Sequence, residues 1–138
     1  MTHALPLWRS ILFVPVLNDK FLQGAPKRGA DCIQLDLEDA IPPDQKDAAR
    51  LKIAEAADSL VANGCDVLVR IYRSYRLAVP DIEASVRGSV RALTLPKVPN
   101  AAHVQSIAEI VEEVEREQGL AIGHTRFVVM IETAQALA

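Results

Sequence analysis

The chain has 138 residues, with 15 Lys and Arg side chains against 18 Asp and Glu side chains, so its formal net charge is −3. Half of the residues are hydrophobic, which is enough for one packed core and excludes a disordered chain. The slight acidity argues against a nucleic-acid binder, whose affinity depends on neutralising phosphates. No apolar run approaches the roughly 18 to 20 residues that span a bilayer, and the opening MTHALPLWRS lacks the pattern of a secretory signal. We therefore expect a cytoplasmic, globular chain that forms a single domain over residues 1–138, with no membrane or nucleic-acid partner.

Short apolar runs alternate with longer segments of helical periodicity along the chain. The apolar runs predict buried strands, and the Ala-rich or amphipathic segments predict helices. The predicted strands are 11–14, 32–37, 66–71, 92–95 and 127–131. The predicted helices are 19–27, 45–63, 81–90 and a long one from Asn100 to Gly119, with 72–80 as a loop. This order predicts an α/β fold in which helices cover a parallel sheet.

Two α/β architectures share this order of elements: an open doubly wound sheet and a (β/α)8 barrel. A barrel takes about 250 residues, so the length alone favours the open sheet. The sequence, however, has no G-x-G-x-x-G, P-loop or G-x-S-x-G motif, and the lack of a nucleotide-binding fingerprint weakens the open-sheet alternative.

Charged side chains follow the ends of four predicted strands. They are Asp36, Glu38, Asp39, Arg70, Lys97 and Glu132. Because the carboxyl ends of parallel strands meet at one edge, we expect these groups to share one rim. There the carboxylates can hold a hard cation and the basic groups can bind an anionic substrate. The alternative is structural, with an acidic cap before a turn and salt bridges at the strand ends.

Five sequence blocks occur in a recognisable order. They are RSILFVP at 9–15, GADCIQLDLEDAI at 29–41, VLVRI at 67–71, LTLPKV at 93–98 and VVMIETAQA at 128–136. Together they resemble the HpcH/HpaI aldolase/citrate lyase family, particularly its citrate lyase β-subunit-like branch of CoA-ester lyases. The resemblance implies a TIM (β/α)8 barrel, of which this chain covers about the first five βα units. It also implies a homo-oligomer or a further half barrel, because the open sheet edges need a partner.

The resemblance implies an activity as well: a Mg2+-dependent carbon–carbon lyase that joins or separates a 2-oxo acid and the enolate of an acyl-CoA. In this family pattern Glu132 binds Mg2+ directly, Glu38 and Asp39 hold its waters, and Arg70 contacts the keto acid during catalysis. The second direct ligand and the general acid/base would lie beyond Ala138. These roles agree with the preference of Mg2+ for oxygen ligands, few carboxylates and several retained waters.

Near the first strand the sequence departs from the family pattern. Val16 stands in place of a usual glycine, and Asn18 and Gly24 stand where relatives carry Arg and Lys for the phosphates of CoA. Lys20 and the basic pair at 27–28 are the substitutes, so we expect Lys20 to contact the substrate. Because CoA binding is in question, two alternatives stay open. One is an aldolase for free pyruvate-type 2-oxo acids, and the other is an inactive fragment or scaffold subunit.

Overall fold

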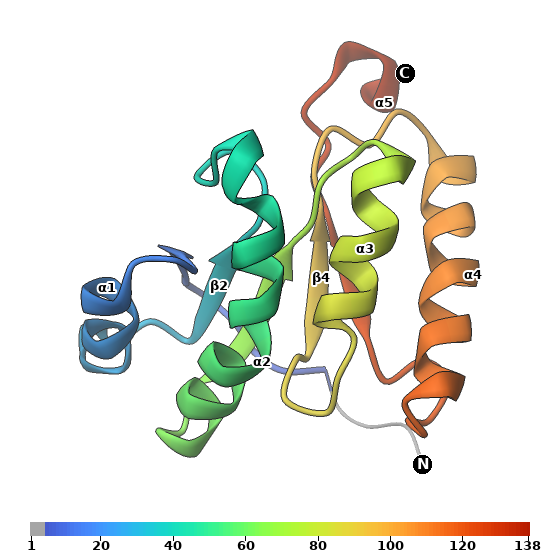
Figure 1. Ribbon diagram of the computed structural model, residues 1–138. Helices are drawn as coiled ribbons and strands as arrows, with labels where there is room; N and C mark the ends of the chain where they lie inside the picture. The colour runs from blue at the N-terminus through green and yellow to red at the C-terminus, as the bar shows by residue number, and fades with distance from the viewer. Residues whose placement is uncertain (1–4) are drawn as a thin grey trace.

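The computed structural model describes residues 5–138, and residues 1–4 of the predicted domain lie outside this range. Five parallel strands form one sheet in the order β1-β2-β3-β4-β5 (Figure 1). The strands are β1 Ile11–Pro15, β2 Cys32–Asp36, β3 Asp66–Arg70, β4 Ala92–Leu95 and β5 Arg126–Val129. The helices are α1 Asp19–Gly24, α2 Lys46–Ala62, α3 Tyr75–Ser85, α4 Ala101–Glu117 and α5 Ala134–Leu137, with 3-10 turns at Ala25–Arg28 and Pro43–Gln45. The predicted alternation of strands and helices is confirmed.

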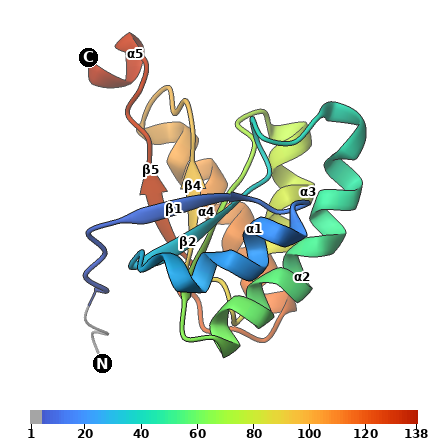
Figure 2. The same cartoon turned by 90° about the vertical axis from the view of Figure 1, so that its left-hand side faces the viewer.

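The strand order separates the two architectures that the sequence left open. In a doubly wound sheet the strand order reverses at a switch point, whereas a barrel adds each strand beside the previous one. Helices α2, α3 and α4 lie over the same face of the sheet (Figure 1). The strands turn progressively from β1, which runs across the view in Figure 2, to β5, which stands upright. Sequential order, strong twist and helices on one side describe the wall of a barrel.

The face of the sheet toward the helices is uniformly apolar. Alternate residues of the three central strands point to this side because side chains in a strand alternate. They are Ile33, Leu35, Val67, Val69, Leu93 and Leu95, each at most 1% exposed. Ile53 of α2, Ile82 of α3 and Ile107 of α4 pack against them in one cluster. Burial of each such side chain contributes about 1.5–3 kcal/mol, so this layer supplies most of the driving force for folding.

The opposite face changes in polarity along the strands. At the strand starts Trp8 packs against Cys32, Leu68 and Ala92, and its indole N–H donates to Asp66 Oδ2 at 2.9 Å. Burial raises the pKa of the Cys32 thiol to about 11, so this cysteine is a protonated core residue. These side chains form an apolar layer on this face near the starts of the strands.

A polar layer follows, and a charged layer follows that. The Thr94 hydroxyl donates to Gln34 Oε1, and both side chains are buried. Asp36 comes two residues after Gln34 on β2 and is paired in register with Arg70, which is itself paired with Thr94. On this face the buried charged pair of Asp36 and Arg70 thus lies toward the carboxyl ends of the strands.

The segment after β3 differs from the prediction. We expected a loop over 72–80 and a helix over 81–90, but α3 runs from Tyr75 to Ser85 and contains Pro80. Proline usually ends a helix because it has no N–H to donate. Here Ala78 and Ile82, one turn apart, are both fully buried, so packing of this stripe keeps the helix continuous through Pro80.

The other predicted boundaries are close to those observed. The predicted helix at 19–27 is α-helical to Gly24 and continues as a 3-10 turn to Arg28. The fifth strand ends at Val129 rather than at residue 131. None of the helices among residues 5–138 is both long enough and apolar enough to span a bilayer.

We expect the loss of one buried carboxylate on α4 to destabilise the fold. Glu115 is 0% exposed and accepts hydrogen bonds from the N–H groups of Gly123 and Thr125, at 2.8 and 2.7 Å. Glu115→Ala leaves both N–H groups without a partner, so the free energy of unfolding should fall by about 3 kcal/mol in urea titrations. Glu112→Ala on the exposed face of α4 is the control and should change it by less than about 1 kcal/mol. Equal losses in the two variants would contradict this role.

Candidate functional site

The turn after β2 is folded around the carboxylate of Asp36. Its Oδ1 accepts the N–H of Glu38 at 2.9 Å, and its Oδ2 accepts the N–H of Ala40 at 3.0 Å. Asp36 is 2% exposed, so the carboxylate replaces water as the partner of these two backbone donors. The LEDA segment therefore has a fixed backbone, and Glu38 points to the same side of the sheet as Asp36.

The guanidinium of Arg70 is bound to the same carboxylate through two parallel hydrogen bonds. Arg70 Nε lies 2.8 Å from Asp36 Oδ1, and Nη2 lies 2.8 Å from Oδ2. The ring of Phe13 packs 5.1 Å from the guanidinium carbon. Burial alone would raise the pKa of Asp36, but the hydrogen bonds from Arg70, Glu38 and Ala40 bring that pKa below its usual value. The hydrogen bond to Asp36 likewise raises the pKa of Arg70, so both groups stay charged.

Glu38 is the most deeply buried carboxylate that has free coordinating capacity at this rim. Its side chain is 2% exposed, and Oε1 lies 3.8 Å from Arg70 Nη1 and 3.5 Å from Lys97 Nζ. Its Oε2 is buried and has no hydrogen-bond partner among residues 5–138. Burial raises the pKa of Glu38, while the positive charges of Arg70 and Lys97 act in the opposite direction. An unpartnered buried carboxylate oxygen at this position suits a hydrogen-bond donor such as a water bound to a cation.

Lys97 joins the ends of β2, β4 and β5. Its backbone N–H donates to Glu132 Oε1 at 2.8 Å, and its ammonium lies 3.5 Å from Glu38 Oε1 and 3.6 Å from Asp39 Oδ1. The backbone of Lys97 has a φ of 49°, in the left-handed region that costs a non-glycine residue about 1–2 kcal/mol. The contact with Glu132 helps to hold this conformation. The charges of Glu38 and Asp39 raise the pKa of Lys97, so its ammonium stays charged.

The rim contains all of the residues that the sequence singled out for it, with Asp36 bound to Arg70. Arg70, Glu38, Asp39, Lys97 and Glu132 are connected by the contacts described above. Both interpretations of the sequence apply to Arg70, which is a salt-bridge partner and also faces the shared rim.

Lys20 lies outside this cluster. It lines a separate hollow of about 610 Å³ beside β1, together with Phe21 and Arg28. Phe13 belongs to both places, because one side of the hollow includes it and its ring packs on Arg70. The predicted substrate contact of Lys20 thus belongs to a neighbouring basic hollow rather than to the acidic rim.

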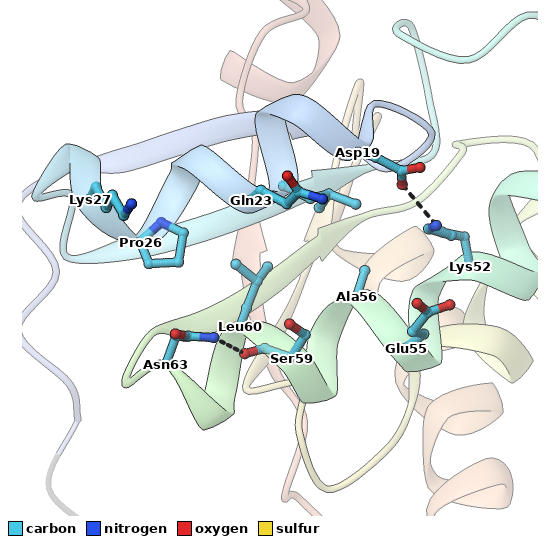
Figure 3. Close-up of a pocket in the computed structure, with 11 residues that line it drawn as sticks. Asp19, Gln23, Pro26, Lys27, Lys52, Glu55, Ala56, Ser59, Leu60 and Asn63 are labelled. Atoms are coloured by element: carbon cyan, nitrogen blue, oxygen red, sulfur yellow. Dashed lines mark hydrogen bonds and ion pairs between the residues drawn. The ribbon is translucent and has the colours of Figure 1, made fainter.

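A second hollow lies between α1 and α2 and contains none of the predicted site residues (Figure 3). It measures about 480 Å³, and the ion pair of Asp19 with Lys52, at 2.8 Å, crosses its edge. Its lining mixes both signs of charge with amide and hydroxyl groups. We therefore place the candidate site at the rim and not in this groove.

Sequence reasoning missed the roles of two residues that build the rim. It placed Asp36 in the acidic segment but did not assign it as the partner of Arg70, and it gave Lys46 no role at all. The register of β2 on β3, which pairs Asp36 with Arg70, is the signal for the first. Nothing in the local sequence marks Lys46, because its burial, at 7% exposed, is visible only in the structure.

Among residues 5–138, no three His, Cys, Asp or Glu side chains are arranged as a complete metal site. Glu38, Asp39 and Glu132 nevertheless supply only oxygen atoms, which is the donor type that Mg2+ prefers, and it takes only one or two of them directly. The unpartnered oxygen of Glu38 fits such an ion. The described residues thus offer part of a ligand set.

The fold and the rim together define part of a (β/α)8 barrel that carries charged groups at the carboxyl ends of its strands. Comparison with known proteins agrees: residues 9–138 match the family described as HpcH/HpaI aldolase/citrate lyase. The chain belongs to this family, as its sequence blocks predicted.

Curated relatives show the same family. Citrate lyase subunit beta of Leuconostoc mesenteroides subsp. cremoris is 34% identical over 132 residues, which are 93% of this chain and 43% of that protein. The mitochondrial citramalyl-CoA lyase of Homo sapiens is 31% identical over 104 residues, which are 73% of this chain and 31% of that protein. The chain therefore spans less than half the length of these relatives.

Solved structures support the fold. Malate synthase of Haloferax volcanii, in a magnesium/glyoxylate complex, has a TM-score of 0.82 at 21% identity and covers 96% of this chain and 45% of its own. Protein CitE of Mycobacterium tuberculosis, in complex with magnesium and pyruvate, has a TM-score of 0.64 at 23% identity and covers 96% of this chain and 48% of its own. The prediction that the chain forms the first five βα units of a TIM barrel is confirmed.

We expect Asp36→Asn to destabilise the protein in a pH-dependent way. Removing one partner of a buried ion pair costs about 3–5 kcal/mol, because Arg70 keeps an uncompensated charge. Since the pKa of Asp36 is lowered on folding, its contribution is present above its ordinary pKa of 3.8 and is lost as the pH falls through the folded value. Urea unfolding at pH 7 and at pH 3 should show a difference between variant and wild type that shrinks in acid. The exposed Asp58→Asn is the control, and a pH-independent difference would contradict the assignment.

Proposed function

We propose that the protein to which this chain belongs is a Mg2+-dependent carbon–carbon lyase acting on the CoA ester of a hydroxy dicarboxylic acid. The activities for which the relatives are named, citrate lyase and citramalyl-CoA lyase, support this class of substrate. The observation that carries the proposal is the rim itself, where Glu38 keeps a buried oxygen with no partner in the described part of the chain, beside Arg70, Lys97 and Glu132. An anionic keto acid and a divalent cation are the ligands that such a mixture of charges suits.

In this proposal Glu132 would bind Mg2+ directly, and Glu38 and Asp39 would hold its waters. The solved relatives with magnesium support the choice of ion for the family. When bound, the ion would polarise a carbonyl oxygen as a Lewis acid. In this scheme Glu38 and Asp39 face both the hydrated ion and the ammonium of Lys97. When no ion is bound, the ammonium alone balances the charge of these carboxylates.

Arg70 binds and orients the keto acid in this scheme. Asp36 already fixes its Nε and Nη2, so the guanidinium presents its remaining N–H groups in a set direction. In the cleavage direction the substrate hydroxyl loses its proton and the adjacent carbon–carbon bond breaks. The products are a 2-oxo acid and a thioester enolate, which then takes up a proton. Fixed positive charge beside the oxygen atoms that gain charge is worth about 3–4 kcal/mol in well-studied sites.

A second candidate, an aldolase for free pyruvate-type 2-oxo acids, has one observation in its favour. Asn18, at a position where the family pattern has a basic residue for CoA, instead caps α1 by accepting the N–H of Phe21 at 3.0 Å. Val16, nearby, is 0% exposed. Neither residue offers a positive charge to a phosphate, so Lys20 and Arg28 carry the case for CoA. The homo-oligomer expected from the sequence stays a prediction.

We expect Glu132→Gln to weaken Mg2+ binding by at least about a hundredfold, because it removes the proposed direct carboxylate ligand. Isothermal titration of MgCl2, with and without glyoxylate, measures this affinity. Glu109→Gln on the exposed face of α4 is the control and should leave it unchanged. Equal Mg2+ affinity in wild type and Glu132→Gln would overturn the assignment. Absence of Mg2+ and keto acid binding in this chain, with binding in a longer chain of the same gene, would support the fragment alternative.

Lys20→Ala tests the CoA part of the proposal. An acyl-CoA at a hundred times its Kd should stabilise the wild type by about 2.7 kcal/mol, measured as a rise in thermal midpoint. The variant should lose much of this rise, because a basic group beside the phosphates is gone, while its glyoxylate affinity stays the same. Stabilisation by glyoxylate but none by acyl-CoA in the wild type would favour the aldolase.

A further inference from the structure

Lys46, the first residue of α2, is buried in an unusual way. It is 7% exposed, although lysine is seldom buried without a carboxylate partner. Its Nζ donates to the carbonyl oxygen of Leu37 at 2.7 Å and to that of Glu38 at 2.9 Å. It also lies 4.6 Å from the centre of the Tyr72 ring. None of the ion pairs within residues 5–138 includes it. The cation is therefore compensated by two backbone carbonyls and a ring face.

The two carbonyls belong to the turn that carries Glu38 and Asp39. The peptide before Glu38 is held on both sides, because the Glu38 N–H donates to Asp36 and the Leu37 carbonyl accepts from Lys46. The peptide after Glu38 is held at its carbonyl oxygen, which accepts from Lys46 and, at 3.2 Å, from the N–H of Ile41. These contacts fix the orientation of the peptide planes before and after Glu38. The direction of the Glu38 side chain follows from that orientation, because its Cα lies between the two planes.

Tyr72, which stacks on Lys46, is held in turn by α2 and α3. Its N–H donates at 2.8 Å to Asp81 Oδ2, and Asp81 Oδ1 accepts from Arg50 Nε at 2.7 Å. Asp81 is 0% exposed, and Arg50 lies one helical turn after Lys46. The start of α2 is thus joined both to the turn after β2 and to the segment that follows Arg70.

Burial of this ammonium has a cost that a purely structural lysine would avoid. Desolvation lowers the pKa of Lys46, while the carboxylates of Asp81 and Asp36 act in the opposite direction. A buried apolar residue of similar length would fill the same space without this penalty. The hydrogen bonds to the carbonyls are therefore the specific contribution of the lysine.

We propose that Lys46 is a positioning residue of the rim: its ammonium orients the Glu38–Asp39 turn, and so sets how these carboxylates face a divalent cation. The part that concerns the cation rests on the proposed function. The part that concerns the turn rests only on the contacts of Lys46.

The test compares Lys46→Met and Lys46→Arg with the wild-type chain. Lys52→Met is the matched control, because Lys52 is on the same helix but pairs with Asp19 at the outer groove. Hydrogen exchange, followed by mass spectrometry without metal, reports the turn at residues 37–45, with the peptide over α4 as an internal reference. In Lys46→Met we expect exchange in the turn to accelerate by about tenfold or more, with α4 unchanged. Lys46→Arg should restore much of the protection, since it can still donate to the carbonyls.

Titration of MgCl2 is the second measurement. In the proposed function Glu38 and Asp39 hold the waters of the ion, so Lys46 acts one step further out than the partner of a direct ligand. Such partners are worth about 10- to 100-fold in affinity, so we expect a loss near the lower value, about tenfold, in Lys46→Met and little change in Lys52→Met. Unchanged exchange in the turn of Lys46→Met, or equal acceleration in Lys52→Met, would overturn the proposal. If Lys46→Met does not fold, Tyr72→Leu must accelerate exchange in the same turn, and unchanged exchange there overturns it. Weak Mg2+ binding by the wild type itself would count against the proposed function alone, because the exchange measurement needs no metal.

Discussion

Asp36 and Arg70 end two adjacent strands and are buried together as an ion pair. The rest of the rim is arranged around this pair. The two oxygen atoms of Asp36 accept four hydrogen bonds, two from the guanidinium and two from the backbone of the following turn. One carboxylate therefore fixes the arginine and folds the acidic segment at the same time. Either charge alone would be expensive at this depth, so the pair is retained as a unit. The pairing of Arg70 with Asp36 is set by the register of β2 on β3, and the turn folded around Asp36 then places Glu38 beside Arg70.

The face of the sheet toward the helices provides most of the stability, and the other face carries the candidate binding site. Toward the helices every central strand contributes apolar side chains, whereas the other face proceeds from an apolar layer at Trp8, through the Gln34–Thr94 pair, to the charged rim. Buried carboxylates occur at both ends, but with different partners. Glu115 has both oxygen atoms occupied by backbone donors near the start of β5, while Glu38 keeps one oxygen free at the opposite end. This polarity along the strands is typical of barrels, in which loops at the carboxyl ends carry the chemistry.

Much of this arrangement was predictable from the sequence, and the failures have physical reasons. The strands were readable because parallel strands buried on both faces are continuous apolar runs, and their final residues predicted the shared rim. The predicted bounds of α3 were wrong because Pro80 suggested a helix boundary, although the buried residues on either side of it belong to one continuous helix. The pairing of Asp36 with Arg70 depends on strand register, and the contacts of Lys46 reach across an irregular turn, so neither follows from local patterns. The roles of Glu132, Glu38 and Asp39 toward a metal came from the family resemblance and stay predictions.

The single tryptophan gives this architecture an optical consequence. Trp8 is wedged against Cys32, Leu68 and Ala92 where the strands begin, and it donates to Asp66. Trp8 is partly buried there, so its emission spectrum reports on the packing of this end of the sheet, which is remote from the charged rim. A ligand that binds only at the charged rim leaves the Trp8 emission unchanged. Unfolding of the sheet exposes the indole to water and shifts the emission maximum toward the red. Trp8 fluorescence thus reports on folding of the sheet separately from ligand binding at the rim.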